Sequence, residues 1–268
     1  MTDEVLYEQR GGVGVITLNR PESLNAMNNA MLDALPEVGR RAEEDPAVRC
    51  VLITGAGRAF CAGGDVKGMT GGRGEAGLLD GGSFDQRVTR LRAQEEISRL
   101  LYEMPKPTVA AINGHAVGAG LSVALAADIR IASEQAKFGT AFGRVGFSGD
   151  FGGTWLLQRL VGPGKAKELY LLGDIIGAER ALELGMVTKV VPHESLMDEA
   201  MALAERLAAG PTLAFARMKE NFVMGATASL ADTLGKEAEN MIASSDTVDH
   251  REAAKAFVEK REPTFRGA

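Results

Sequence analysis

The sequence contains little cysteine. Cys50 and Cys61 are the two cysteines among 268 residues, which is too few for a disulfide framework, and their spacing matches no metal-binding motif. No apolar run approaches the roughly 18 residues that a membrane-spanning helix needs, and no basic stretch followed by an apolar one stands at the N-terminus. We therefore expect a cytoplasmic protein that is neither secreted nor membrane-bound.

Basic residues are also in the minority. The chain has 30 Lys and Arg against 36 Asp and Glu, which gives a net charge of -6. Proteins that bind nucleic acid without sequence preference depend on an excess of positive charge, and no basic stretch interleaved with aromatic residues is present. We expect no nucleic-acid partner.

Two nucleotide-binding patterns are missing as well. No glycine-rich segment ends in the Gly-Lys-Ser/Thr of a P-loop, and none has the Gly-x-Gly-x-x-Gly spacing of a dinucleotide-binding turn after a strand. Nucleotide hydrolysis and hydride transfer therefore lose support.

Glycine, by contrast, is abundant. The 33 glycines gather in short clusters between apolar runs, and twice such a cluster follows a predicted buried strand. A strand at residues 48–54 leads into the cluster at 55–64, and a strand at 108–112 leads into 113–120 and then a helix. Backbone N–H groups left unpaired at such a helix start can donate to an anion or a carbonyl oxygen, although an isolated glycine loop more often only permits a tight turn.

The order of predicted elements indicates an α/β protein with a helical extension. Strands and helices alternate through the first part of the chain, and residues 178–257 are mostly helical apart from a strand at 187–191. We expect a core at residues 1–195 and a C-terminal helical module at 196–268. Residues 69–84 are rich in glycine and poor in large apolar side chains, so they predict a loop that could act as a lid.

Several segments, in order, resemble the enoyl-CoA hydratase/isomerase (crotonase) family. They are NRPESLNA (19–26), GAGRAFCAGGD (55–65), KPTVAAINGHAVGAG (106–120), ADIRIA (127–132), GGT (152–154), AERALELGMV (178–187) and AFVEKR (256–261). The resemblance covers nearly the whole chain. It implies a spiral of ββα units with C-terminal helices that build homotrimers, often paired into hexamers.

The same resemblance assigns candidate site residues. The substrate would be an acyl-CoA thioester whose enolate oxygen accepts hydrogen bonds from the backbone N–H groups of Gly64 and Ala119. Coenzyme A enters as part of the substrate, and no metal or separate cofactor is expected. The positions that match coenzyme A contacts of the family are Ser23, Leu24, Ala62, Asp65, Val66, Lys67, Phe257 and Lys260, the last two across a subunit boundary.

The catalytic side chains depart from the family pattern. Hydratases of this family use two glutamates, but this sequence has Ser122 and Phe142 at the matching positions. A phenyl ring cannot transfer protons, and a serine hydroxyl needs a separate base.

Asp150, which precedes the GGT segment, is the remaining acid/base candidate, as in some isomerases of the family. One carboxylate suffices for a 1,3 proton shift, so we favour an isomerase. The alternatives are a hydratase that uses Asp150 with an unidentified second group and a catalytically silent acyl-CoA-binding protein. Asp150 could instead cap the helix that follows it.

Overall fold

The computed structural model describes residues 3–65 and 81–268 and contains two sheets. The larger sheet has the strand order β1-β2-β3-β5-β7-β10, parallel throughout except for the antiparallel β1–β2 pair. Its strands are β1 (Val5–Arg10), β2 (Val13–Leu18), β3 (Cys50–Gly55), β5 (Thr108–Ile112), β7 (Ile129–Ser133) and β10 (Lys189–Val191). The smaller sheet consists of β4 (Ala59–Cys61), β6 (His115–Val117), β8 (Lys137–Gly139) and β9 (Ile176–Gly177), in that order.

Helices cover both faces of the larger sheet, which explains why its central strands are apolar along their whole length. Alternate residues of β2, β3 and β5 pack against one helix, α8, whose buried residues recur every fourth position; the rest pack on the opposite face. The helices are α1 (Asn29–Glu44), α3 (Phe84–Glu103), α4 (Ala119–Ala126), α5 (Gly153–Val161), α6 (Pro163–Leu172), α7 (Ala178–Glu183), α8 (Leu196–Ala208), α9 (Thr212–Gly225), α10 (Leu230–Ser245) and α11 (Val248–Glu259).

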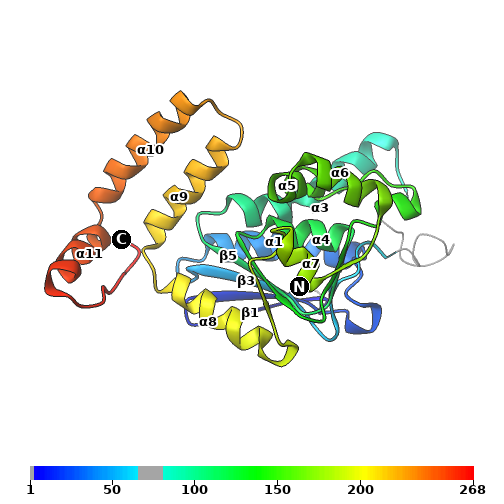
Figure 1. The fold of residues 1–268 in the computed structure, drawn as a ribbon, viewed down its shortest axis with the longest axis horizontal. Coiled ribbons are helices and arrows are strands. Elements are labelled where there is room, and N and C mark those ends of the chain that lie inside the picture. Colours follow the sequence, from blue (N-terminus) through cyan, green and yellow to red (C-terminus); the bar gives the residue numbers. More distant parts are fainter. Residues whose placement is uncertain (1–2, 66–80) are drawn as a thin grey trace.

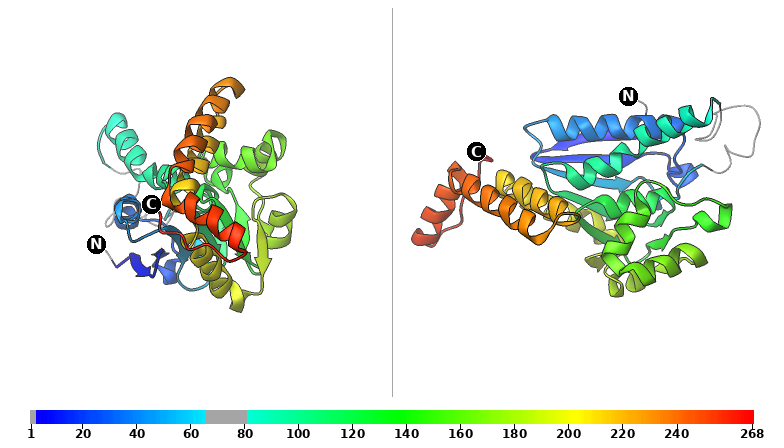
Figure 2. Two further views of the ribbon diagram at one scale, coloured as in Figure 1. Left: turned by 90° about the vertical axis from the view of Figure 1, so that its left-hand side faces the viewer. Right: turned by 90° about the horizontal axis from the view of Figure 1, so that it is seen from above.

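The last three helices extend away from the α/β body. In Figures 1 and 2, α9, α10 and α11 form an arm on one side of the sheets. The predicted division at residue 195 falls just before α8, which still packs on the larger sheet. That division stays a prediction.

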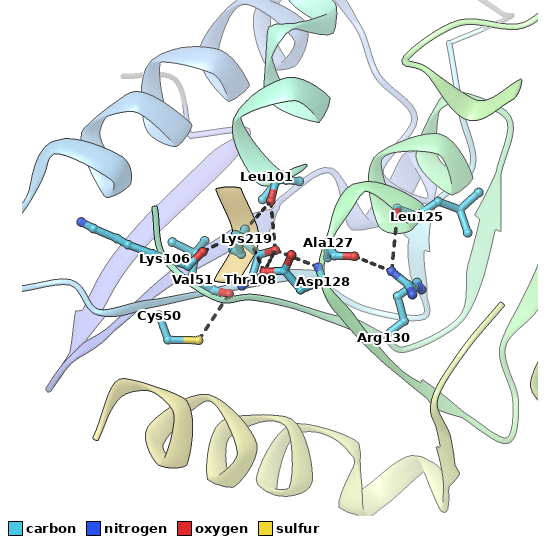
Figure 3. Close-up of polar contacts among 10 residues, drawn as sticks. All are labelled: Cys50, Val51, Leu101, Lys106, Thr108, Leu125, Ala127, Asp128, Arg130 and Lys219. Carbon is cyan, nitrogen blue, oxygen red and sulfur yellow. Dashed lines mark hydrogen bonds and ion pairs between the residues drawn. The ribbon is translucent and has the colours of Figure 1, made fainter. Parts of the chain in front are cut away.

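A polar network ties the arm to the body (Figure 3). Lys219 of α9 donates hydrogen bonds to the Asp128 carboxylate at 2.8 Å, to the Leu101 carbonyl at 3.2 Å and to the Lys106 carbonyl at 3.0 Å. The same Asp128 oxygen accepts from the backbone N–H and the hydroxyl of Thr108. Since Lys219 is nearly buried, this pairing satisfies a charge that would otherwise be costly to remove from water.

The structure bears on the predicted glycine-rich loop and on the expected lack of a membrane-spanning helix. The predicted loop at residues 69–84 lies mostly outside the described residues; at its end, Ser83 forms a capping box with Gln86 and α3 begins at Phe84. Among the described helices, none is long and apolar enough to cross a bilayer.

Candidate active site

Two buried asparagines fix the first glycine loop. The Asn25 side-chain amide donates to the carbonyls of Ala56 and Ala59, at 2.9 and 2.7 Å. The Asn113 amide donates to the carbonyls of Gly55 and Gly57, at 2.9 and 2.8 Å, and also to that of Ala59. These bonds satisfy carbonyl groups that the tight turn leaves without a sheet partner, so the loop is held from two sides.

The segment before α1 runs parallel to the end of this loop. Met27 N–H donates to Gly63 carbonyl at 2.8 Å, and the N–H groups of Ala62 and Asp65 donate to the carbonyls of Leu24 and Met27. The Asp65 carboxylate also pairs with Arg20 at 3.1 Å. The structure thereby brings together four predicted coenzyme A contacts, namely Ser23, Leu24, Ala62 and Asp65.

The two glycine segments meet at the start of α4. A Cβ added to Gly63 would lie 2.9 Å from the Val117 carbonyl oxygen and 3.7 Å from the Ala119 nitrogen. Gly118, with φ +56°, directs the chain into α4 so that Ala119 is its first residue. Only residues without a side chain allow the two backbones to approach this closely.

The predicted oxyanion donors, Gly64 and Ala119, belong to these adjoining segments. Ala119 N–H is one of the groups that a helix start leaves unpaired. Over residues 3–65 and 81–268, neither Ala119 N–H nor Gly64 N–H donates a hydrogen bond to another backbone group. Both groups are thus available to a carbonyl oxygen, as the expected role requires.

The first turn of α4 packs tightly against Cys61 of β4. A Cβ on Gly120 would lie 2.6 Å from Cys61 Cβ and 2.7 Å from its sulfur. Burial raises the pKa of the Cys61 thiol to about 12, so the thiol stays protonated at neutral pH. Cys61 therefore acts here as a small packing residue.

Ser122, one turn further along α4, is bonded within the protein. Its hydroxyl donates to the Gly118 carbonyl at 3.3 Å and forms a hydrogen bond with Tyr170 of α6. Burial raises the pKa of Tyr170 to about 12. Tyr170 also stacks on the buried ring of Phe142, with centroids 5.9 Å apart. Ser122 and Phe142, the two residues that depart from the family pattern, therefore pack together with Tyr170 in an uncharged cluster.

Asp150 lies beside this cluster, in the turn before α5. Gly149 and Gly152 have φ of +109° and +73°, and between them the buried Phe151 has φ +50°, which is unusual for a residue with a side chain. Gly153 lies so close to the Ser122 and Tyr170 hydroxyls that a side chain there would clash with both. The turn therefore holds Asp150 close to the first turns of α4.

The Asp150 carboxylate does not cap α5. That helix begins at Gly153 with Gly152 as its N-cap and without a side-chain cap, so the helix-cap alternative is wrong. Asp150 Oδ1 is buried and has no hydrogen-bond partner among the described residues. Such an unsatisfied buried oxygen is costly in a folded protein and is typical of a group that serves a substrate.

The pKa of Asp150 is raised to about 7, from an ordinary value of 3.8. Burial is the main cause, and the negative charge of Glu95 on α3 is the second. A carboxyl group that titrates near neutral pH can both accept and donate a proton under physiological conditions. Glu95 was not among the predicted site residues, since it belongs to a helix distant in sequence and no local motif marks it.

Other predicted site residues lie elsewhere. Phe257 and Lys260 are exposed on and after α11, at the far end of the arm, so within one chain they do not join the glycine loops (Figure 1). Val66 and Lys67 lie outside the described residues. Trp155 of α5 borders two cavities of about 340 and 360 Å³, which are lined in part by α3 and α9.

Comparisons with known proteins identify the same family over nearly the whole chain. The family model described as enoyl-CoA hydratase/isomerase matches residues 8–268. The chain is 39% identical to a 1,2-epoxyphenylacetyl-CoA isomerase of Escherichia coli strain K12 over the full length of both chains. It is 36% identical to a short-chain-enoyl-CoA hydratase of Clostridium acetobutylicum, over 97% of this chain and 96% of that relative. A crystal structure of an enoyl-CoA hydratase from Bacillus anthracis matches with a TM-score of 0.90 at 33% identity, covering 99% of this chain and all of the other.

Proposed function

The chain belongs to the enoyl-CoA hydratase/isomerase family, and we propose that within it this enzyme moves a proton along an unsaturated acyl-CoA, with Asp150 as acid and base. The observation that carries this proposal is the carboxylate of Asp150, which is half-buried, has no hydrogen-bond partner on Oδ1 among the described residues and has a pKa of about 7. It lies beside the helix start that carries Ala119.

In the proposed reaction, ionised Asp150 removes a proton from the carbon chain of the acyl group. The electrons move onto the thioester oxygen, where the N–H groups of Gly64 and Ala119 stabilise the negative charge. Protonated Asp150 then returns the proton to a different carbon, so the double bond moves and nothing else is consumed. Donors of this kind act most strongly on charge that develops in the transition state, and loss of one typically costs roughly 10²–10³ in rate.

The residues at positions 122 and 142 support a proton shift over hydration. Addition of water by a pair of acidic side chains would need carboxylates where the chain has the hydrogen-bonded Ser122 and the stacked Phe142. The proposed reaction needs no metal or redox cofactor, and coenzyme A enters with the substrate.

The test is the variant Asp150→Asn, which keeps the shape of the side chain but cannot accept a proton. We expect affinity for acyl-CoA, measured by calorimetry, to be retained, and turnover of 3-enoyl-CoA substrates to fall by about 10²–10⁴. Ser122→Ala, the control, should change turnover little. Unchanged turnover in Asp150→Asn would remove this residue from the mechanism.

Hydration is the second candidate, because relatives at similar identity are named hydratases. The two reactions differ in whether water enters the product. In H₂¹⁸O, a proton shift yields an unlabelled isomer, whereas hydration yields a hydroxyacyl-CoA that carries ¹⁸O. Binding of acyl-CoA without turnover across chain lengths would instead favour the silent binding protein.

Homotrimers, alone or paired into hexamers, form the other part of this proposal. The arm exposes many large apolar side chains, including Phe222, Leu230, Met241, Ile242, Phe257 and Val258, each more than 60% exposed. Exposed apolar area on this scale is typical of an interface. Association would also allow Phe257 and Lys260 to reach the coenzyme A of a neighbouring subunit.

Light scattering after size-exclusion chromatography tests this association. We expect a trimer or hexamer for the wild type and smaller species for the double variant Met241→Glu/Ile242→Glu. Leu171→Glu, which changes an equally exposed apolar residue on the body, is the matched control. A monomeric wild type at micromolar concentration would contradict the proposal.

A further inference from the structure

Glu95 of α3 contacts the backbone of the turn that carries Asp150. Its carboxylate oxygen Oε1 accepts a hydrogen bond from the Phe151 N–H at 3.0 Å. That N–H belongs to the peptide group that joins Asp150 to Phe151. A charged acceptor makes this bond stronger than one between neutral groups.

The bond holds a backbone conformation that the turn would not adopt readily alone. Phe151 has φ +50° although it carries a large, buried side chain. Residues with a side chain are strained in this region and persist there where surrounding contacts determine them. The bond from Glu95 and the packing of the Phe151 ring are such contacts, so Glu95 helps to fix the direction of the neighbouring Asp150 side chain.

Glu95 is also the charged group that matters most for Asp150. The negative charge of Glu95 on α3 raises the pKa of Asp150, and Asp150 in turn acts on the pKa values of Cys61 on β4 and Tyr170 on α6. Burial raises the pKa of both Cys61 and Tyr170 to about 12, so both are neutral at the pH where Asp150 titrates. The neighbouring negative charge therefore comes from Glu95.

We propose that Glu95 is a positioning residue for Asp150: its carboxylate holds the Asp150–Phe151 turn and places a second acidic group beside the carboxylate that exchanges the proton. The inference rests on the proposed function for its kinetic consequence. The two carboxylates have separate tasks, because one Glu95 oxygen is occupied by the backbone whereas Asp150 Oδ1 has no described partner.

The first measurement follows Asp150 directly and needs no substrate. The protein is labelled with ¹³C at the aspartate carboxyls, the Asp150 signal is assigned by its loss in Asp150→Asn, and its titration is compared between the wild type and Glu95→Gln. The amide oxygen of glutamine can still accept from Phe151, so this variant removes the charge alone. We expect the pKa of Asp150 to fall by roughly 0.5–1 unit.

Glu96→Gln is the matched control, because it removes the same charge one residue away, where the glutamate pairs with Arg99. An Asp150 titration that moves no further in Glu95→Gln than in Glu96→Gln would overturn the proposal. Since Glu95→Gln is nearly isosteric, it should fold even if larger changes at this position do not.

The second measurement is the pH dependence of turnover of trans-3-hexenoyl-CoA. In Glu95→Gln, we expect the pKa of the acidic limb of the profile to fall by the same amount as the pKa measured by NMR. Glu95→Ala also loses the hydrogen bond, and we expect it to lower kcat about 10–100-fold with little change in KM. If the pKa of Asp150 changes but the acidic limb of the pH–rate profile does not, the proposed function is contradicted, whereas the positioning role of Glu95 is not. A kcat in Glu95→Ala equal to that in Glu95→Gln would overturn the role of the hydrogen bond.

Discussion

The buried carboxylate of Asp150 has a cost to the stability of the folded protein. Burial and the charge of Glu95 raise its pKa to about 7, so the folded state holds a proton between roughly pH 4 and 7 that the unfolded chain, with its ordinary pKa near 3.8, has already lost. Stability therefore falls as pH rises through this window. Above pH 7 the buried carboxylate is ionised and the full penalty is present.

We accordingly expect Asp150→Asn to be more stable than the wild type at pH 8, by on the order of 1–3 kcal/mol, and to match it near pH 4. Urea unfolding at both pH values and at one fixed protein concentration measures the difference. A variant that is less stable by the same amount at both pH values would indicate that the Asp150 carboxylate makes favourable contacts in the folded state.

At the scale of elements, the contact between α4 and β4 determines where Ala119 lies. Gly120 is the position of closest approach, and a methyl group there would meet the carbonyl oxygen, Cβ and sulfur of Cys61. Two of these atoms belong to the rigid strand end, so the helix start would have to shift. A shift of α4 moves the N–H of the preceding residue.

We expect Gly120→Ala to lower the free energy of unfolding by about 1–3 kcal/mol and to lower kcat more than acyl-CoA affinity. Gly164→Ala is the matched control, because that glycine lies in α6 with open space around it and should change stability by no more than about 0.5 kcal/mol. Thermal melts and steady-state kinetics compare the two variants. Equal behaviour of both would contradict the close packing at Gly120.

The central strands of the larger sheet could be predicted from the sequence, because burial on both faces requires uninterrupted apolar runs. The edge strand β1 is mostly exposed and has no such run to indicate it. The runs at 13–18, 48–54 and 108–112 correspond to β2, β3 and β5. The smaller sheet could not be predicted. Its strands are two or three residues long and lie partly within glycine-rich segments, where alternation of side chains has no room to develop and the pairing depends on distant partners.

Some residues of the candidate site could also be predicted from the sequence, and others could not. Gly64, Ala119 and Asp150 could be proposed from local motifs, because each belongs to a segment with a recognisable pattern. Glu95 could not, since its contact with the Asp150 turn joins residues 56 positions apart and depends on how α3 packs against the turn before α5. The contacts of Phe257 and Lys260 with coenzyme A stay predictions, because a single chain does not bring them to the glycine loops.

For the molecule as a whole, Lys219 is a buried polar link between the arm and the body, and Arg49 adds hydrogen bonds to Thr212 and to the Phe265 carbonyl. The Lys219 ammonium group lies among Asp128 and two carbonyl groups at the carboxyl-terminal side of α3, and burial lowers its pKa despite the attraction of Asp128. Removing it leaves the Asp128 carboxylate without its counter-charge.

We expect Lys219→Met to lower the free energy of unfolding by about 1–3 kcal/mol, and the double variant Lys219→Met/Asp128→Asn to recover part of that loss. The control is Lys236→Met, which breaks an ion pair with the exposed Glu220 side chain and should lower stability less than Lys219→Met does. Urea unfolding of all the variants gives the comparison. If Lys219→Met loses no more stability than Lys236→Met, the buried ion pair stabilises the protein no more than an exposed one.

The two buried cysteines give this protein a pair of built-in reporters of local opening. Each thiol has a pKa raised to about 12, so neither reacts appreciably with a thiol reagent while it stays covered. Cys50 lies in the larger sheet beneath α8, whereas Cys61 lies against the first turn of α4. Labelling rates in single-cysteine variants would thus measure the exposure of the two places separately. A faster rate at Cys61 would mean that the candidate active site opens locally while the larger sheet stays closed.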